Sequence, residues 1–585
     1  MSQMAGASVS DSDSLELHFE KRGVAELWLT LLTLAVYGLS LTCGFVYDDR
    51  VTVQPGTAGQ SWSNVISYFT TNLSFEHNSN FYRPFVITYI GAMNSICGSS
   101  AFGWHLASLL LHLICVLLVF AFAKRLLHSG STAFIAAALF AVHPTHVEAV
   151  TWISAAGEPL MTIFILSAAL AFLNWRAGKS PAWLALSIAA AMGALLCKET
   201  AVVTPALISA LVLLPAATAA RSLRAQLAAT AAFWIEAFAF LHTRTHVLHG
   251  FSHPFTGASN TDMVLSWPAA IVFYVRDMFF PVGMSPVYPF TFVHSPAASG
   301  FIFPLLAVIL LAAAVIWFLR QSAEWRLYLT CLVWIAAPLA PVMYLKLFPP
   351  FELVHDRYLY ISTIGLSIAA AAAITSLVSR AESLGIARLR GLTAALLIGV
   401  SAAATIGYES WWQSDVTLFK RALTVTPNNE TVLTDLGVAL MEHKQYQAGI
   451  GYLDQALQLD PNNSDAIFNR GRAAWEMGDN ALALRCFERS LQLSPQPARW
   501  IYLASVDLRL GKPADAEFAA RQALSLDPNA PNTHLAIGAA LQAQGNKPAA
   551  IAEFEEEQRQ HPDSQGARQM LQQARSQKLD NEFKP

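Results

Sequence analysis

The sequence predicts an all-α protein in two parts, a membrane body with about eleven spanning helices and a following solenoid of helical repeats. The chain of 585 residues is 54% apolar and only 13% charged, with a mean hydropathy of +0.41, whereas a soluble domain carries about 25% charged residues. Of its 77 charged side chains, 38 lie in residues 411–585, where prolines recur at a regular interval. The chain therefore consists of an apolar body that ends near residue 410 and a soluble tail.

The first membrane span is expected at residues 24–46. This apolar run is long enough to cross a hydrocarbon core of about 30 Å, and the polar residues 1–23 before it end in Lys21-Arg22. Because no cleavage site of the A-x-A kind follows, we interpret it as a retained span rather than a signal peptide. Ten further apolar stretches bring the total to about eleven spans: 102–123, 131–147, 157–175, 181–197, 200–215, 226–243, 300–319, 325–348, 359–380 and 391–407.

Lysine and arginine side chains in short loops predict the orientation of these spans. With the N-terminus in the cytoplasm, loops such as Lys124-Arg125 fall on the cytoplasmic side, provided that 267–281 enters the membrane without crossing it. An odd number of spans then places the tail outside the cytoplasm. Charges at span ends are costly and usually functional, so the outer face, where several acids and bases gather, is expected to hold the active site.

The tail has the spacing of tetratricopeptide repeats. Its prolines are 34, 34, 33 and 34 residues apart, which is the tetratricopeptide period: Pro427, Pro461, Pro495, Pro528 and Pro562. A small residue stands at the same place in each of four repeats, where two helices approach closely: Gly437, Gly471, Ala504 and Gly538. Such an array forms a solenoid with a concave surface, which we expect to bind an acceptor protein or peptide, although a spacer is also consistent.

Charge and cysteine usage exclude two classes of function. The formal net charge is −3 and the chain has no long basic run, so no nucleic-acid partner is expected. The six cysteines form neither a disulfide framework nor a CxxC metal pair.

Two adjacent carboxylates, Asp48 and Asp49, begin the first outer loop. Such groups can raise one another's pKa, and a carboxylate at a dry boundary can act as a general base. Alone, the pair also fits a solvated span end. Its position beside the other outer motifs favours catalysis.

Two arginines lie on the same face, Arg83 in segment 81–84 and Arg357 in segment 355–358. A lone arginine there can extend to lipid head groups, but guanidinium groups also suit phosphate oxygens. Two of them predict a site for a phosphate-bearing lipid. We assign Arg83, Asp356, Arg357 and Tyr358 to substrate binding.

The outer end of the third span carries His143, His146 and Glu148. They lack the i, i+4 histidine pair of an HExxH zinc helix, so no metal ligands are assigned. We assign the histidines to substrate recognition and Glu148 to a second catalytic acid. Lys198-Glu199 fits a structural ion pair or a substrate contact equally well and is included in the binding set.

In this order the motifs resemble the transmembrane and tetratricopeptide-repeat O-mannosyltransferases, the TMTC proteins, and more broadly the protein O-mannosyltransferase branch of the GT-C glycosyltransferases. The resemblance covers nearly the whole chain. It rests on Asp48-Asp49, Tyr82-Arg83-Pro84, His143-Pro144 with Glu148-Ala149-Val150, Lys198-Glu199, Ser285-Pro286-Val287-Tyr288-Pro289 and Arg357-Tyr358-Leu359-Tyr360.

The resemblance implies transfer of a sugar, mannose, from a polyprenyl-phosphate carrier to Ser or Thr hydroxyls of an extracytoplasmic protein. It implies that Asp48 takes the proton of the acceptor hydroxyl and that Asp49 and Glu148 hold or polarise the site. Arg83 and Arg357 would neutralise the departing lipid phosphate. A single displacement then inverts the sugar carbon. This scheme requires no cofactor, and it is compatible with a bound divalent cation.

The predicted organisation comprises a cytoplasmic segment 1–23, a GT-C-like membrane domain 24–410, a connecting helix 411–427, four repeats over 428–562 and a capping tail 563–585. The repeats would recruit the acceptor. The expected location is a bacterial inner membrane with a periplasmic active site, the alternative being the endoplasmic reticulum. Alternative functions are a transferase that uses a lipid-linked oligosaccharide or modifies a glycan or lipid, and a non-catalytic membrane-anchored scaffold.

Overall fold

The computed structural model describes residues 23–50, 65–70, 80–215, 221–251, 257–349, 352–382 and 389–582, and every regular element there is a helix. This confirms the predicted all-α class. The chain divides into two compact units, Met1–Leu418 and Phe419–Pro585. The predicted N-terminal segment lies outside the described residues except for Gly23.

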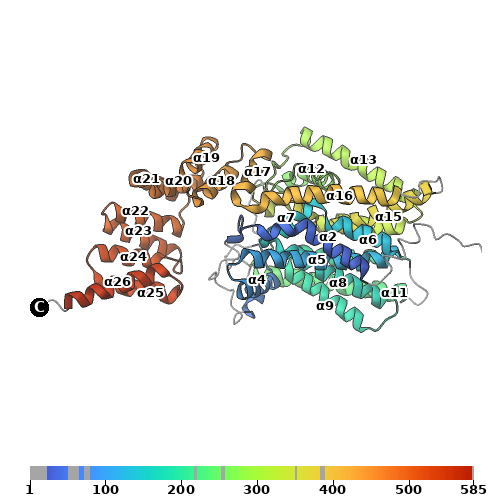
Figure 1. Cartoon of the computed structure of the whole chain (residues 1–585), viewed down its shortest axis with the longest axis horizontal. Coiled ribbons are helices and arrows are strands. Elements are labelled where there is room, and N and C mark those ends of the chain that lie inside the picture. The colour runs from blue at the N-terminus through green and yellow to red at the C-terminus, as the bar shows by residue number, and fades with distance from the viewer. Residues whose placement is uncertain are drawn as a thin grey trace, which may run out of the picture. The chain divides into compact units, whose positions relative to one another are not determined.

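The first unit is a bundle of helices, many of them long (Figure 1). Its α-helices are α2 (Val24–Tyr37), α4 (Pro84–Cys97), α5 (Ala101–Leu127), α6 (Gly130–Ala141), α7 (Val147–Thr151), α8 (Gly157–Arg176), α9 (Ala182–Cys197), α10 (Thr204–Leu211), α11 (Leu223–Val247), α12 (Asn260–Phe279), α13 (Ser299–Gln321), α14 (Trp325–Ala336), α15 (Ser362–Glu382), α16 (Leu389–Glu409) and the start of α17 (Asp415–Val425). Short 3-10 turns connect several of them. Small and aromatic side chains fill the core, where the rings of Phe122 and Trp334 lie 4.7 Å apart.

Fewer helices of membrane-spanning length are found among the described residues than the apolar stretches predict. Among the described residues, six helices are long and apolar enough to cross a membrane, or seven if the pair Gly130–Ala141 and Pro144–Thr151, bent by 53°, forms one span. Four other apolar helices have only 10–17 residues. An apolar run in the sequence does not show where its helix breaks, and α9 is separated from α10 by Lys198 and a 3-10 turn. The protein is a membrane protein, but about eleven crossings are not confirmed.

Helix α13 shows most clearly that the bundle needs an apolar solvent. Its most apolar continuous segment of 18 residues has a mean hydropathy of 2.8, and none of these residues is buried inside the unit. Apolar side chains such as Phe303, Leu310 and Trp317 are each more than 60% exposed. Because soluble proteins rarely leave so large an apolar surface open, the lipid bilayer is the environment that covers this helix.

The second unit is a stack of helical hairpins (Figure 1). The hairpins are α18 (Glu430–Glu442) with α19 (Tyr446–Leu459), α20 (Ser464–Glu476) with α21 (Asn480–Leu493), α22 (Pro497–Arg509) with α23 (Pro513–Leu526) and α24 (Thr533–Ala543) with α25 (Lys547–Gln560), followed by α26 (Gln565–Glu582). Four of the regularly spaced prolines follow a hairpin, so proline spacing predicts where each repeat ends. This confirms the predicted repeat solenoid.

The hairpins close because a small residue stands at each crossing, and this can be tested at Gly538. A Cβ there would lie 2.5 Å from a ring carbon of Phe554 and 3.1 Å from the Ala550 carbonyl oxygen. We expect Gly538→Ala to destabilise the fourth hairpin by about 1–3 kcal/mol because the added methyl overpacks the crossing. Hydrogen exchange of the α24 and α25 amides in the full chain measures the change.

The control for this substitution is Gly451→Ala. Gly451 lies in α19, and nothing is within 4 Å of its added Cβ. Because alanine favours the helix over glycine by roughly 1 kcal/mol, the control is expected to leave amide exchange unchanged or slower. Equal exchange in the two variants would contradict the role assigned to the small residues.

Candidate active site

The loop that bears the adjacent carboxylates is held in an unusual backbone conformation. Tyr47 has a φ of +57°, which is rare for a bulky residue and marks a constrained position. Its amide donates to Asp415 at 2.7 Å, and its hydroxyl donates to Glu352. Asp415 also pairs with Arg50 at 2.9 Å. The loop is therefore fixed on several sides by residues far away in the sequence.

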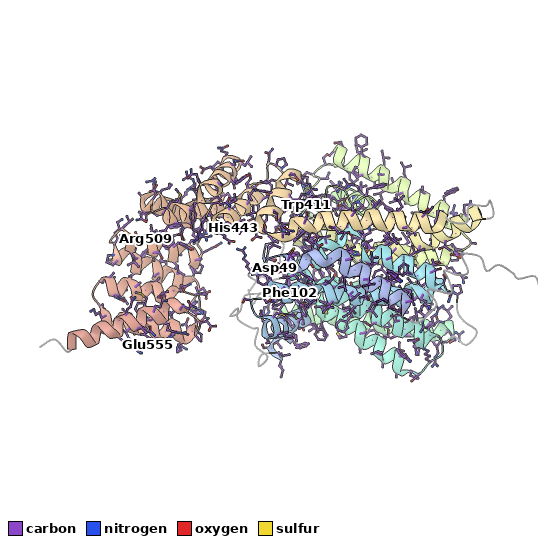
Figure 2. The ribbon with its side chains drawn as sticks, in the orientation of Figure 1. Asp49, Phe102, Trp411, His443, Arg509 and Glu555 are labelled. Carbon is purple, nitrogen blue, oxygen red and sulfur yellow. The ribbon has the colours of Figure 1, made fainter. Side chains whose placement is uncertain are left out.

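The 3-10 turn Ser410–Gln413, which follows α16, provides a further attachment for this loop. The Gly44 amide donates to the Gln413 carbonyl oxygen at 3.2 Å, two residues before Asp415. Figure 2 shows Asp49 and Trp411 at the same end of the first unit's helices. The loop and the segment that follows the last apolar helix thus form one local structure.

Asp48 and Asp49 have different surroundings, which suit different roles. Asp49 is fully buried; its Oδ1 accepts from the Ser154 amide at 2.9 Å and hydroxyl at 2.8 Å, and its Oδ2 accepts from the Val46 amide at 3.2 Å. Burial raises the pKa of Asp49 to about 7; the Ser154 hydrogen bonds oppose this rise and the neighbouring Asp48 adds to it. With both oxygens engaged by the protein, Asp49 is suited to holding the loop.

Asp48 remains exposed to solvent. Its Oδ1 accepts a hydrogen bond from the Trp152 indole nitrogen at 3.0 Å. Protein atoms around the carboxylate partly dehydrate it and raise the pKa of Asp48, while hydrogen bonds from Ser154 and Trp152 and the charge of Arg357 oppose the rise. A carboxylate with raised basicity that remains accessible is suited to taking a proton from an incoming hydroxyl.

Three pairs of a cation and a carboxylate lie on the segments around this loop. Arg83, the residue before α4, binds Glu199 through two hydrogen bonds of 3.0 and 2.6 Å. Lys198 pairs with Glu158 at the start of α8. Arg357, in the 3-10 turn Asp356–Leu359, pairs with Glu148 in α7 through its side chain and donates to it from its amide at 2.9 Å.

Aromatic rings connect these pairs to Asp48. The Arg357 guanidinium lies 4.8 Å from the Trp152 ring centroid and 5.0 Å from that of Tyr358. The Lys198 ammonium lies 5.2 Å from the Tyr358 ring, and Lys198 is adjacent in the chain to Glu199, the partner of Arg83. The structure therefore brings seven of the predicted residues together: Asp48, Arg83, Glu148, Lys198, Glu199, Arg357 and Tyr358.

Electrostatics keep Arg357 charged in this setting. Burial opposes the charge, but Glu148 and other nearby groups outweigh it and hold the pKa of Arg357 above its ordinary value. The side chain is 15% exposed. A guanidinium has five N–H donors, so one that is paired with Glu148 still has donors to present to an anion.

The two predicted histidines are buried and contact protein groups. His143 contacts the Thr145 hydroxyl at 2.8 Å and the Met278 carbonyl oxygen of α12 at 3.1 Å. His146 is fully buried and contacts the Thr363 hydroxyl of α15 at 2.7 Å. These contacts tie the segment before Glu148 to two other helices, which favours a role in positioning this segment over direct contact with substrate.

Asp356 is likewise enclosed by protein. Its two oxygens accept from the hydroxyls of Tyr288 at 2.7 Å and Tyr408 at 3.2 Å. Burial raises the pKa of Asp356 well above its ordinary value, and the charges of Glu148 and Asp277 add to the rise. Asp356 anchors the turn that presents Arg357, and the contact with Tyr288 explains the place of segment 285–289 among the motifs.

Sequence reasoning missed four residues at this site: Trp152, Ser154, Glu158 and Asp415. Glu158 is an isolated acid at the start of an apolar stretch, without the neighbouring histidines or lysine that drew attention to Glu148 and Glu199. Trp152 and Ser154 belong to a segment between two motifs and carry no charge to attract notice. Asp415 lies in the charge-rich tail, and no local pattern distinguishes it from its acidic neighbours.

A small pocket borders the pairs. It is lined by polar groups from Glu158, Thr200 and Tyr358 and by the apolar side chains of Met161, Pro338, Val342 and Ile361. Within the described ranges, no group of three histidine, cysteine or acidic side chains is arranged to hold a metal ion. The groups that the site offers are carboxylates, cations and aromatic faces.

Known families match both parts of the chain. Residues 82–242 match the family described as dolichyl-phosphate-mannose-protein mannosyltransferase, and residues 440–505 and 503–565 match tetratricopeptide repeats. Protein O-mannosyl-transferase TMTC3 of Homo sapiens is 25% identical over 72% of this chain. The chain is similar to the TMTC proteins. This confirms the resemblance drawn from the motifs.

Other TMTC proteins match shorter regions at higher identity. Tmtc1 of Drosophila melanogaster is 32% identical over 29% of this chain and Tmtc2 is 34% identical over 32%. The chain spans about half the length of TMTC3, with 49% covered, and about a fifth of Tmtc1 and Tmtc2, with 20% and 21% covered. Among solved structures, the crystal structure of MamA protein matches 25% of this chain and 80% of its own at 22% identity, with a TM-score of 0.23.

Proposed function

We propose that the chain is an integral-membrane glycosyltransferase that moves mannose from a polyprenyl-phosphate carrier to Ser or Thr hydroxyls of an extracytoplasmic protein. The observation that carries this proposal is the juxtaposition of Asp48, an accessible carboxylate of raised basicity, with the charged guanidinium of Arg357, both of which contact Trp152. A base for the acceptor and a cation for the leaving phosphate are the two groups that this transfer needs. The names of the TMTC relatives support the reaction class.

The reaction assigns one role to each side of the site. Asp48 takes the proton of the acceptor hydroxyl as its oxygen forms a bond to C1 of the sugar. The bond between C1 and the carrier phosphate breaks, and its electron pair leaves with the phosphate, whose growing charge Arg357, Arg83 and Lys198 stabilise. One displacement of this kind inverts C1. A divalent cation is not needed for either step.

The two remaining parts of the proposal concern location and the repeats. The repeats would recruit the acceptor, because stacked hairpins provide a concave surface for a peptide. The active site and the repeats would face the periplasm from a bacterial inner membrane, or the lumen if the membrane is that of the endoplasmic reticulum.

The transfer can be measured directly. Membranes that contain the full chain are incubated with labelled polyprenyl-phosphate mannose and the proteins of the same cells. We expect the protein fraction to become labelled. Mild alkali should release this label, because it removes sugars attached to Ser or Thr oxygens. Label that enters only the lipid or glycan fraction would support an acceptor other than protein, and no label in any fraction would favour the scaffold function over the enzyme.

A further inference from the structure

Trp152 lies where the two halves of the proposed reaction meet. It stands between α7 and the 3-10 turn Ile153–Ala156, and only 7% of it is exposed. Its indole nitrogen donates to Asp48 Oδ1 at 3.0 Å, and its ring centroid lies 4.8 Å from the Arg357 guanidinium. One side chain therefore contacts both the candidate base and the candidate phosphate-binding cation.

The partner of this indole distinguishes Trp152 from other tryptophans of the unit. The indole nitrogens of Trp104, Trp334 and Trp267 donate to the backbone carbonyl oxygens of Gly98, Leu207 and Met343. For the buried Trp104 and Trp334 such a contact satisfies a buried polar group, which is the ordinary requirement of a packed tryptophan. The indole of Trp152 instead donates to an exposed carboxylate, which water could solvate without it, so packing alone does not account for the arrangement.

Each part of the side chain has a separate effect. An indole N–H donates and cannot accept, so it favours the ionised carboxylate and occupies Oδ1, which leaves Oδ2 to take the proton. The aromatic face attracts the guanidinium, which is worth about 0.5–2 kcal/mol depending on burial. The rings of Tyr47 and Trp412, 5.6 and 6.3 Å away, hold the indole in this orientation.

We propose that Trp152 is a positioning residue that couples the two halves of the reaction, with its N–H orienting Asp48 and its face holding Arg357 against the leaving phosphate. The inference rests on the proposed function. It adds that one side chain positions both the base and the phosphate-binding cation. Because the N–H makes one contact and the ring face makes the other, the two contacts can be removed separately.

The test separates those contacts by substitution. Trp152→Phe keeps an aromatic face and removes the N–H donor, whereas Trp152→Leu removes both. The matched control is Trp267→Phe, which removes an indole hydrogen bond from α12 to the Met343 carbonyl oxygen, at an exposed position. The full chain in membranes is assayed with polyprenyl-phosphate mannose, and kcat, the KM for the donor and the pH profile are measured.

For Trp152→Phe we expect the acid limb of the profile to move to higher pH, by roughly half a unit or more, because the ionised carboxylate loses a donor. The other charged groups around Asp48, namely Asp49, Glu352 and Arg357, remain in place. The kcat should fall by roughly tenfold, with the donor KM changed less than about threefold because the aromatic face is retained. Trp152→Leu should also raise the donor KM by roughly tenfold or more, and Trp267→Phe should change none of these quantities.

A binding measurement keeps the inference testable if turnover is lost. Polyprenyl phosphate alone should raise the thermal unfolding temperature of the wild-type chain and of Trp152→Phe, and it should raise that of Trp152→Leu much less. An unshifted acid limb in Trp152→Phe would overturn the coupling, and so would equal donor binding in the Phe and Leu variants. If Asp48→Asn is inactive in the same assay, the proposed function still stands. Full activity of Asp48→Asn would overturn both.

Discussion

Replacing Asp48 by asparagine is expected to abolish sugar transfer while the chain still folds and enters the membrane. The amide has the shape of the carboxylate and can still accept the Trp152 hydrogen bond, so the loop should keep its conformation. It cannot take a proton from the acceptor hydroxyl. Loss of a general base lowers rates by about 10²–10⁴-fold, and the transfer assay with labelled polyprenyl-phosphate mannose measures the decrease.

The control for Asp48→Asn is Asp479→Asn in the repeat unit. Asp479 accepts from the Leu482 amide at 3.0 Å as the N-cap of α21, and asparagine caps a helix as well as aspartate does. The control should therefore transfer sugar at the wild-type rate, with equal expression of the two variants. Full activity of Asp48→Asn would show that the base has been assigned to the wrong residue.

The second large effect is expected at Arg357, where activity and stability are linked. Arg357→Met removes the cation that contacts Trp152, and it leaves the buried carboxylate of Glu148 with the His355 ring at 3.1 Å but without its guanidinium partner. Removing one partner of a buried ion pair costs about 3–5 kcal/mol. We expect both transfer and the thermal unfolding temperature of the detergent-solubilised chain to fall.

A double variant separates the two effects. Adding Glu148→Gln to Arg357→Met removes the unpaired charge, so the unfolding temperature should recover in large part. Transfer should not recover, because the leaving phosphate still lacks its cation. Recovery of transfer together with stability would mean that Arg357 supports the fold and takes no part in the chemistry.

Most of the architecture could be read from the sequence, because it depends on local patterns. Proline spacing in the tail indicates helical hairpins, since proline is unfavourable inside a helix and recurs here after the second helix of each hairpin. The apolar stretches coincide with helices because a membrane body buries its backbone polar groups in helices. The positions of helix breaks, such as the one at Lys198, could not be predicted, because they depend on the partner that a side chain finds in the fold.

The sequence pointed to some of the residues of the candidate site, but to none of their contacts. Outer-face charges identified Asp48, Arg83, Glu148 and Arg357, but no pattern shows that Glu148 pairs with Arg357. Pairing is decided by how the segments come together, and that is a property of the packed bundle. The same reason explains why the histidines, which look like ligands in the sequence, lie buried against α12 and α15.

Gln413 and Asp415 bind the loop Gly44–Arg50 through hydrogen bonds and an ion pair. These contacts decide where the chain can be truncated without disturbing the loop. A truncation at residue 410, where the apolar sequence ends, would retain every apolar helix and still remove the groups that hold Tyr47 in its strained conformation. A chimera that exchanges the repeats should therefore be joined after Leu418, where the compact unit ends.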